Sequence, residues 1–220
     1  MITAPVLGAV YVRLMDAPGR PLNVPRETPK AVLDAYLLGA AHDGCVNKKH
    51  GTLRICQANL AWLRTLDDVI RLLGARAWTY REGDRGVWVI ETSYRLPSLD
   101  LFASHEVAAA YARGYFDAEG GVPVDPRARF YVQFVQKDYE DLVTVRDILR
   151  MLGIEWGRLH NPSAKVDPHY WRFYVLSRSH LAFIRGVGSW HPRKSLVLEL
   201  QLHERAQSGM TMIFTPRLVL

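Results

Sequence analysis

The sequence predicts an α+β fold in which two pseudo-symmetric αββαββα repeats pair their central helices and build antiparallel sheets. Two observations support this prediction. A helix-like stretch that ends in acids and glycines, residues 111–121, has a weaker copy at residues 36–45. Two landmarks recur 79 positions later in the second copy: Gln57 as Gln136, and Gly74 as Gly153. Constant spacing of this kind indicates an internal duplication.

The two copies differ in length between their shared glycine and their acid. Gly114 and Glu119 are five positions apart, whereas Gly39 and Asp43 are four apart. Either the first copy has lost one residue, or its helix uses a shifted register with Leu38 at the position of Gly114. We favour the shifted register, because it keeps the acid-glycine pairs aligned.

The elements of the first half follow from local patterns. Residues 1–30 carry five prolines and no sustained hydrophobic period, which indicates an arm or a short strand plus linker. Proline suits the first turn of a helix, so a helix is expected from Thr28-Pro29 to about Ala41. A hairpin at 45–57, a helix at 59–73 and a second hairpin at 77–92 follow, since apolar residues alternate or recur at helical spacing there.

The second half repeats this order. Ser104 is expected to cap its motif helix. Further elements are strands at about 121–124, 129–136, 154–160 and 170–177, helices at 138–152 and from Ser179, and a final helix from Pro192 to about Ala206. The predicted organisation is an arm (1–30), a first repeat (31–100) and a second repeat with the C-terminal helix (101–220).

Composition narrows the class of protein. The 220 residues have a net charge of +6 and a sequence pI of about 9.4, which suits a polyanionic partner. We expect no membrane span and no secretory signal, hence an intracellular protein of the cytoplasm or an organelle matrix. Cys45 and Cys56 lack metal-ligand spacing and are expected to be buried thiols. Four tryptophans in apolar patterns are expected in the core: Trp62, Trp78, Trp156 and Trp171.

Strand alternation predicts a polar, basic face on each sheet. This face recurs in three strands, each alternating with apolar residues: Thr52 and Arg54; Arg129, Tyr131 and Gln133; Arg172 and Tyr174. Arginine and glutamine bond base edges, and basic side chains neutralise phosphates. A merely solvated sheet face is the alternative. The polar, basic face occurs in both halves of the chain, which favours its interpretation as a nucleic-acid surface.

The two acid-ended helices also suggest chemistry. A helix that ends in carboxylates and turns on glycine places negative charge at one point. Two such helices side by side would bring Asp43 and Glu119 together. Paired carboxylates suit a divalent cation and phosphodiester hydrolysis.

These motifs carry a family resemblance. Residues 112–120, Ala-Arg-Gly-Tyr-Phe-Asp-Ala-Glu-Gly, closely match the nine-residue motif of the LAGLIDADG homing endonucleases, and residues 36–44 match it loosely. Over about residues 31–206 the chain resembles the single-chain, two-repeat type. The resemblance implies a pseudo-twofold axis between the motif helices and a β-saddle in the DNA major groove. It also implies a monomeric nuclease that cuts both strands of a long, asymmetric double-stranded target.

The resemblance also implies site residues. Asp43 and Glu119, with Gly44 and Gly120 beside them, would bind catalytic Mg²⁺. Gln57 and Gln136 occupy matching positions and are catalytic candidates; their strand parity with apolar residues is equally consistent with capping of the following helices. The residues expected to contact DNA are Lys48, Lys49, Arg54, Arg76, Tyr80, Arg81, Arg127, Arg129, Tyr131, Gln133, Arg172, Tyr174 and Lys194.

Other groups near the motifs have structural interpretations. We expect Asp117 to orient the motif end and His42 to pair with a neighbouring residue. Lys48, Lys49 and Lys194 are weak candidates for a basic auxiliary residue, and a solvated turn or helix start is favoured for each.

Two functions of different class remain. Retention of the acid-glycine pair in both repeats favours a metal-dependent endonuclease, encoded in an intron, in an intein or as a free-standing gene. A shortened first motif would displace Asp43 and leave a non-cleaving DNA-binding protein or an RNA-splicing maturase on the same scaffold.

Overall fold

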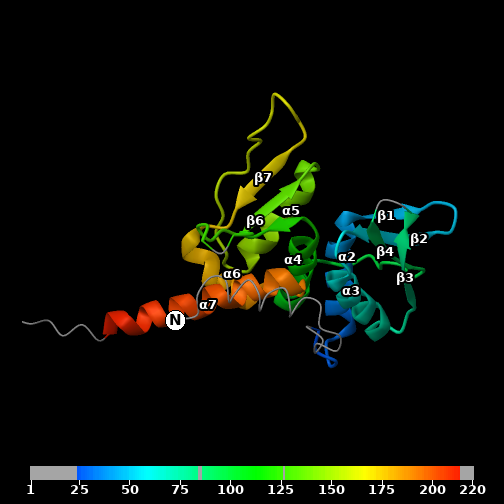
Figure 1. Ribbon diagram of the computed structural model, residues 1–220, viewed down its shortest axis with the longest axis horizontal. Coiled ribbons are helices and arrows are strands. Elements are labelled where there is room, and N and C mark those ends of the chain that lie inside the picture. Colours follow the sequence, from blue (N-terminus) through cyan, green and yellow to red (C-terminus); the bar gives the residue numbers. More distant parts are fainter. Residues whose placement is uncertain (1–23, 84–85, 126, 214–220) are drawn as a thin grey trace, which may run out of the picture.

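The computed structural model describes residues 24–83, 86–125 and 127–213. It has an α+β architecture in which two antiparallel sheets flank a central pair of helices (Figure 1). The predicted α+β class is therefore confirmed. Most of the predicted N-terminal arm, residues 1–23, lies outside the described residues.

The central helices are α2 (Lys30–Ala40) and α4 (His105–Glu119), which pack directly against each other. A Cβ on Gly39 would lie 2.2 Å from the carbonyl oxygen of Tyr111, and one on Gly114 would lie 2.0 Å from that of Tyr36. Any side chain at either glycine would force the backbones apart. Because these contacts are reciprocal, Gly39 and Gly114 are equivalent, and the favoured register with Leu38 at the Gly114 position is wrong.

The first copy of the motif has instead lost one residue. α2 ends at Ala40 and continues as the 3₁₀ turn η1 (Ala41–Asp43), whereas α4 stays α-helical to Glu119. A 3₁₀ helix rises about 2.0 Å per residue and an α-helix about 1.5 Å. From glycine to acid, both copies therefore span about 7.5 Å. The tighter turn restores the length that the deletion removes.

The first sheet has four antiparallel strands in the order β1 (Gly44–Asn47), β2 (Thr52–Gln57), β4 (Val87–Thr92) and β3 (Ala77–Glu82). α3 (Leu60–Leu72) covers its inner face and buries Trp62, Leu63 and Leu66. Both predicted hairpins and the helix between them are confirmed. Gly51, at a φ of 65°, closes the turn between β1 and β2.

The second sheet is smaller than expected. It contains β5 (Gly120–Gly121), β6 (Gln133–Gln136) and β7 (Trp171–Tyr174) in that order. The strand predicted at 154–160 is reduced to isolated bridges at Trp156 and His160. Pro123 lacks the N–H that a ladder needs and stands two residues beyond the end of β5. The second αββαββα repeat is thus incomplete.

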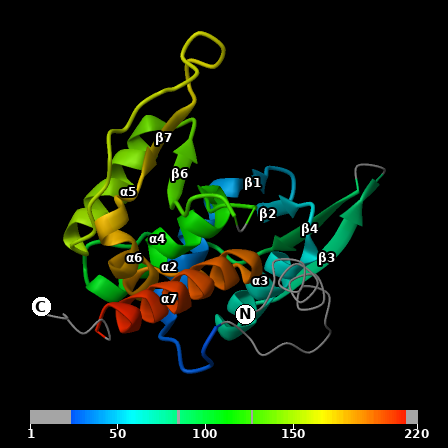
Figure 2. The same ribbon diagram turned by 60° about the vertical axis from the view of Figure 1, so that its left-hand side comes forward.

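Helices surround this second sheet. α5 (Tyr139–Met151) begins at the cap Asp138; it is followed after β7 by η3 (Ser177–Ser179), α6 (His180–Gly186) and α7 (Pro192–Ile213). Ser104 caps α4 as expected, since its Oγ accepts a hydrogen bond from the Val107 N–H at 3.2 Å. In Figure 2, α7 runs across the side of the molecule opposite the tips of the hairpins.

Some burial expectations are corrected. Trp62 is buried, but Trp78 is 46% exposed, because it lies on the outer face of the edge strand β3. Cys45 is exposed and Cys56 is half-buried, so they are not core thiols. Among the described residues, every helix is too short or too polar to cross a bilayer.

Candidate metal centre and nucleic-acid surface

Asp43 and Glu119 end the two motif segments and stand one residue before the glycines that begin β1 and β5. In register, Gly44 is opposite Ile55 and Gly120 is opposite Phe134. η1, which ends at Asp43, packs against α4, which ends at Glu119, and the charge of Asp43 raises the pKa of Glu119. The structure therefore brings the two predicted acids together despite the shortened first motif.

Each acid has its own glutamine. Gln57 donates a hydrogen bond from Nε2 to Asp43 Oδ2. A hydrogen bond from the Gln136 side chain lowers the pKa of Glu119. Each glutamine lies two positions beyond Ile55 or Phe134 and so shares their inward face. An inward-facing position is the one that the site requires, because the motif helices and their acids lie on the inner side of the sheets.

The alternative role of these glutamines as helix caps is wrong. α3 is capped by Asn59, whose side chain accepts a hydrogen bond from the Ala61 N–H at 2.7 Å. Asp138 caps α5 and accepts from the Glu140 N–H at 2.9 Å. Gln136 Oε1 accepts a hydrogen bond from the Lys137 N–H at 2.7 Å, one residue before the cap Asp138, so neither glutamine is the N-cap of the following helix.

Burial raises the pKa of Asp43 to about 6, although Gln57 and Lys194 oppose this shift. The pKa of Glu119 also rises to about 6, first through burial and second through the charge of Asp43. Two half-buried carboxylates that repel each other favour a cation between them.

The oxygen donors here fit magnesium. Among the described residues no group of three or more His, Cys, Asp or Glu side chains could hold a metal. Mg²⁺ does not require such a cage: it binds through one or two carboxylates, keeps several waters and takes further oxygens from its substrate. Asp43 and Glu119 would be the ligands. Gly120 has a separate packing reason, because a Cβ there would lie 2.1 Å from the Phe116 ring.

Asp117 has the orienting role expected of it. It is 2% exposed, and Oδ2 accepts hydrogen bonds from Tyr36 Oη at 2.8 Å and from the backbone N–H groups of Trp190 at 2.9 Å and His191 at 3.0 Å. Ser189 Oγ donates to its other oxygen. Asp117 thus joins α4 to α2 and to the segment before α7, and its oxygens are committed to these contacts.

His42 also pairs with neighbours, as expected. Its Nε2 lies 2.8 Å from Tyr111 Oη, and its Nδ1 lies 3.0 Å from Asp141 Oδ2. Both ring nitrogens are therefore engaged by α4 and α5. The contact links the end of the first motif to the second half of the chain.

The burial and the contacts of Lys194 differ from those expected. It lies in the first turn of α7, is only 9% exposed, and donates from Nζ to the carbonyl oxygens of Phe116 at 2.7 Å and Asp117 at 2.8 Å. Burial lowers its pKa to about 8. It is neither a DNA-surface residue nor part of a solvated helix start. The pattern His191-Pro192-Arg193-Lys194 gave no local sign that the chain folds back beneath α4.

On the outer face of the first sheet, the predicted DNA contacts already have protein partners. Arg54 donates to Glu82 Oε1, and Tyr80 Oη donates to Glu91 Oε2 at 3.0 Å. Glu91 is buried and also accepts a hydrogen bond from Thr52. This face is an internally bonded polar network, and its acids were missed by the sequence interpretation.

The outer face of the second sheet matches the expected pattern more closely. The rings of Tyr131 and Tyr174 meet edge to face at 5.9 Å, and the guanidinium of Arg172 lies over the Tyr174 ring at 5.5 Å. Gln133 is opposite Tyr174 in register. The structure therefore brings four predicted contacts onto one half-exposed face.

The remaining predicted DNA contacts are scattered. Lys48 and Lys49 are exposed in the turn between β1 and β2, and Arg76 is exposed just before β3. Arg81 shares the strand face of Ala77 and Thr79, which is turned toward α3. Arg127 pairs with Asp125 at 3.3 Å in the loop after β5.

Arg129 also lies outside a strand. It is exposed in the same loop. The sequence placed Arg129 inside a strand that begins only at Gln133. The expected outward strand face is therefore wrong for Arg129.

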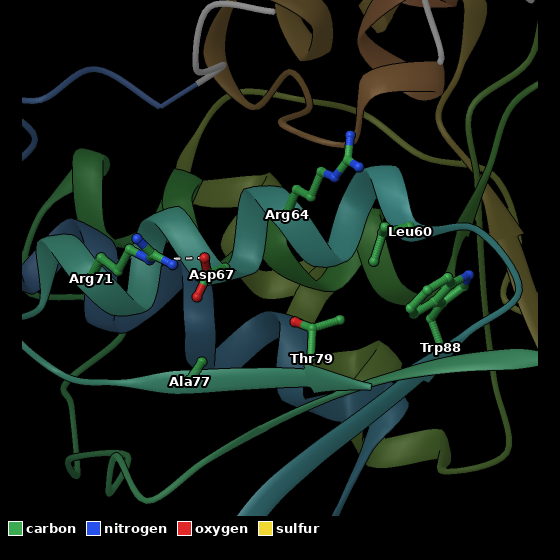
Figure 3. Close-up of a pocket in the computed structure, with 7 residues that line it drawn as sticks. All are labelled: Leu60, Arg64, Asp67, Arg71, Ala77, Thr79 and Trp88. Carbon is green, nitrogen blue, oxygen red and sulfur yellow. Dashed lines mark ion pairs between the residues drawn. The ribbon is translucent and has the colours of Figure 1, made fainter. Parts of the chain in front are cut away.

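A pocket lies on the α3 side of the first sheet, away from the acid pair. In Figure 3, the Asp67–Arg71 ion pair lies on the side of α3 that faces Ala77 and Thr79, whereas the Arg64 side chain extends away from the strands. The ion pair is 2.8 Å long, and Arg71 is largely exposed. None of the predicted catalytic residues lines this pocket.

The geometry defines a class of scaffold: paired helices ending in acids, with antiparallel sheets on their flanks. Comparison agrees, since residues 106–187 match the family model of a LAGLIDADG-like domain. No curated protein sequence gives a significant match. The family match spans less than half of the chain, and the fold is also supported by solved structures.

Three solved structures illustrate the likeness. The N-terminal LAGLIDADG domain of DUF199/WhiA has a TM-score of 0.61 at 19% identity, with 76% of this chain and 87% of that chain covered. Full-length DUF199/WhiA from Thermatoga maritima has a TM-score of 0.63 at 18% identity, covering 87% and 68%. I-DmoI in complex with DNA and Mn has a TM-score of 0.54 at 14% identity, covering 73% and 98%.

These likenesses show the fold. The chain has a LAGLIDADG-like α+β scaffold that resembles both I-DmoI, described as a homing endonuclease, and DUF199/WhiA. The pairing of α2 with α4 is the feature of this chain that corresponds to the sequence motif. Activity is a separate question from the scaffold.

Proposed function

We propose that this protein is a metal-dependent, site-specific DNA endonuclease. The observation that carries the proposal is the interacting pair Asp43 and Glu119 at the adjoining ends of α2 and α4, each with its own glutamine. A deletion in the first motif would separate the acids if nothing compensated for it. The 3₁₀ turn η1 compensates and keeps the pair.

The roles follow from the geometry. Asp43 and Glu119 would hold Mg²⁺, which when bound supplies Lewis acidity to the scissile phosphate and lowers the pKa of bound water. Gln57 fixes the orientation of Asp43 through its amide, and Gln136 does the same for Glu119. Half-burial of both acids limits the water around the reacting phosphate.

The substrate would be double-stranded DNA. The face that holds Tyr131, Gln133, Arg172 and Tyr174 has the residue types that bond base edges and phosphates. The first sheet presents a different, acid-containing face, so the two half-sites would differ in sequence. I-DmoI, which shares the scaffold, was solved with DNA and Mn. We further propose that the chain acts as an intracellular monomer with repeats at about 31–100 and 101–220.

The direct test is digestion of a randomised DNA library with the purified chain and Mg²⁺, followed by sequencing of the cut ends. A recurring cut site that disappears with EDTA and with Glu119→Gln supports the proposal. Recovery of bound but uncut DNA would refute cleavage.

A second candidate function is DNA or RNA binding without cleavage, as in a regulator or a splicing maturase. The observation that favours it is the altered first motif together with the ion-paired Arg54 and the acids of the first sheet. Electrophoretic mobility shifts on the same library, with structured RNA as a second substrate, separate the two binding modes.

A further inference from the structure

A short segment before and within α7 crosses the base of both motif helices. The Trp190 ring packs on Tyr36 of α2 with centroids 4.4 Å apart. The His191 ring stacks on Trp62 of α3 at 5.8 Å. On the other half, Asp117 accepts hydrogen bonds from the backbone of this segment. The segment therefore holds the first half against the end of α4.

This segment lies beyond the part of the chain that matches the LAGLIDADG-like family model, which ends at residue 187. Its contacts with the motif helices therefore lie outside the matched range. Lys194 is the charged residue that it delivers. Its ammonium is buried beneath the last turn of α4.

The end of α4 concentrates negative charge. The last four carbonyls of a helix have no partner within it, and the helix dipole adds a partial negative charge at that end. Glu119, the last residue of α4, adds a full charge, and Asp43 adds another beside it. Carboxylates at a helix C-terminus are unfavourable. Lys194 compensates for both effects: its ammonium brings a positive charge, and it donates to the Asp117 carbonyl and to the Phe116 carbonyl, which also accepts from the Gly120 N–H.

The effect of Lys194 reaches both acids. Its charge lowers the pKa of Asp43 and of Glu119, against the upward effect of burial, and its own pKa is raised by Asp117 first and then by Glu119 and Asp43. The last turn of α2, which lies entirely within the described residues, has no basic side chain of its own. The cation from α7 is therefore shared by the two motif ends.

We propose that Lys194 is a positioning residue for the acid pair: from α7 it fixes the last turn of α4 and balances the charge of Asp43 and Glu119. This inference deepens the proposed function and rests on it for the role of the acids. Lys194 has two separate roles in this proposal: hydrogen bonding to the carbonyls at the end of α4 and balance of the charge of the acids. Lys194→Gln retains N–H donors for the carbonyls and removes the charge.

The test is a double-mutant cycle on the full chain in EDTA. Lys194→Gln is made in the natural sequence and in the Asp43→Asn, Glu119→Gln background, and urea midpoints are measured at pH 7, between the pKa of about 6 of the acids and that of about 8 of Lys194. In the natural sequence, we expect Lys194→Gln to lower the urea midpoint clearly. In the background where both acids are amides, this decrease should be smaller by about half or more. An equal loss in both backgrounds would show a purely structural role and overturn the proposal.

Arg193→Gln is the matched control, because it removes the same charge from the neighbouring residue, whose guanidinium reaches Val122 instead. Its loss of midpoint should be equal in the two backgrounds. Should Lys194→Gln fail to fold in the natural sequence, it should still fold in the Asp43→Asn, Glu119→Gln background, where less charge has to be balanced. Failure to fold in both backgrounds, with the double amide variant itself folded, would overturn the proposal.

Cleavage gives a second readout. With a cut site in hand, Lys194→Gln should slow single-turnover cleavage at least about tenfold while the DNA Kd changes less than about twofold. Arg193→Gln should leave the rate near that of the natural protein. If the natural protein cuts no DNA, the proposed nuclease fails, while the stability cycle still decides the role of Lys194.

Discussion

Asp43 and Glu119 are held in surroundings that work against their charges. Each is partly buried and has a pKa raised to about 6 by burial, and the negative charge of Asp43 adds to the rise for Glu119. Residues kept in such positions reduce stability and are concentrated at functional sites. Gln57 and Gln136 oppose the rise in the pKa of these acids through hydrogen bonds, without supplying charge. The partial burial and proximity of these two carboxylates are therefore typical of a site that binds a cation.

The stability cost can be measured. A carboxyl whose folded pKa is raised loses stability as pH rises from its ordinary value near 4 through about 6. Asp43→Asn and Glu119→Gln should therefore each stabilise the fold at pH 8 in EDTA, by about 1 kcal/mol after allowance for solvent screening. At pH 4 the gain should shrink. Urea unfolding at both pH values tests this, and destabilisation at pH 8 would contradict it.

The same substitutions should separate binding from cutting. Glu119→Gln and Asp43→Asn remove metal ligands but leave both sheet faces unchanged. We expect cleavage to fall by at least about 10³-fold, as for loss of a main electrostatic group, with little change in DNA affinity. Single-turnover cleavage and fluorescence anisotropy measure the two quantities. A large loss of affinity with normal cleavage would exclude the metal role.

At the scale of elements, the helix pair determines where the acids meet. Gly39 and Gly114 allow backbone contact between α2 and α4, and η1 corrects the length of the shorter motif. His42 and Asp117 then bond across the pair to Tyr111 and Tyr36. Each motif tyrosine is thus hydrogen-bonded to the end of the other motif, which couples the two halves.

Close contact at Gly114 predicts a severe packing mutant. Gly114→Ala would place a Cβ 2.0 Å from the Tyr36 carbonyl oxygen, so the helices must separate. We expect a loss of about 3 kcal/mol or more, at or above the upper end for overpacking. Gly186→Ala is the control, because a Cβ there meets nothing within 4 Å. Similar denaturation midpoints for the two variants would contradict the close contact between α2 and α4 at Gly114.

At the scale of the whole molecule, the two sheets are unequal partners for DNA. The second sheet offers Arg172 stacked on Tyr174, while the first sheet ties Arg54 to Glu82. The net charge of +6 supplies general attraction to a polyanion. Sequence reading should therefore depend more on the second sheet than on the first.

This difference predicts distinct salt dependence for two arginines. Arg172→Ala should weaken DNA binding and reduce the slope of log K against log salt by about 1, because one phosphate or base contact is lost. Arg81→Ala removes the same charge from the α3 side of the first sheet and should leave the slope nearly unchanged. Titrations at several salt concentrations test both. Equal slopes for both variants would remove Arg172 from the interface.

Local pattern was enough for much of this protein. The duplication, the α+β class, the first-half hairpins, the cap at Ser104 and the pairing of Asp43 with Glu119 all follow from periodicity and spacing in the sequence. These features depend on neighbours in the chain or on symmetry between copies, which a sequence displays directly.

Tertiary contact decided the rest. The one-residue deletion and its 3₁₀ repair depend on where two helices touch, and the partners of Arg54 depend on a neighbouring strand. Lys194 is 77 residues from Asp117, yet it ends beneath it, because the segment before α7 folds back across both motif helices. The sequence does not show which residues far apart along the chain come into contact, so only the folded structure reveals the position of Lys194.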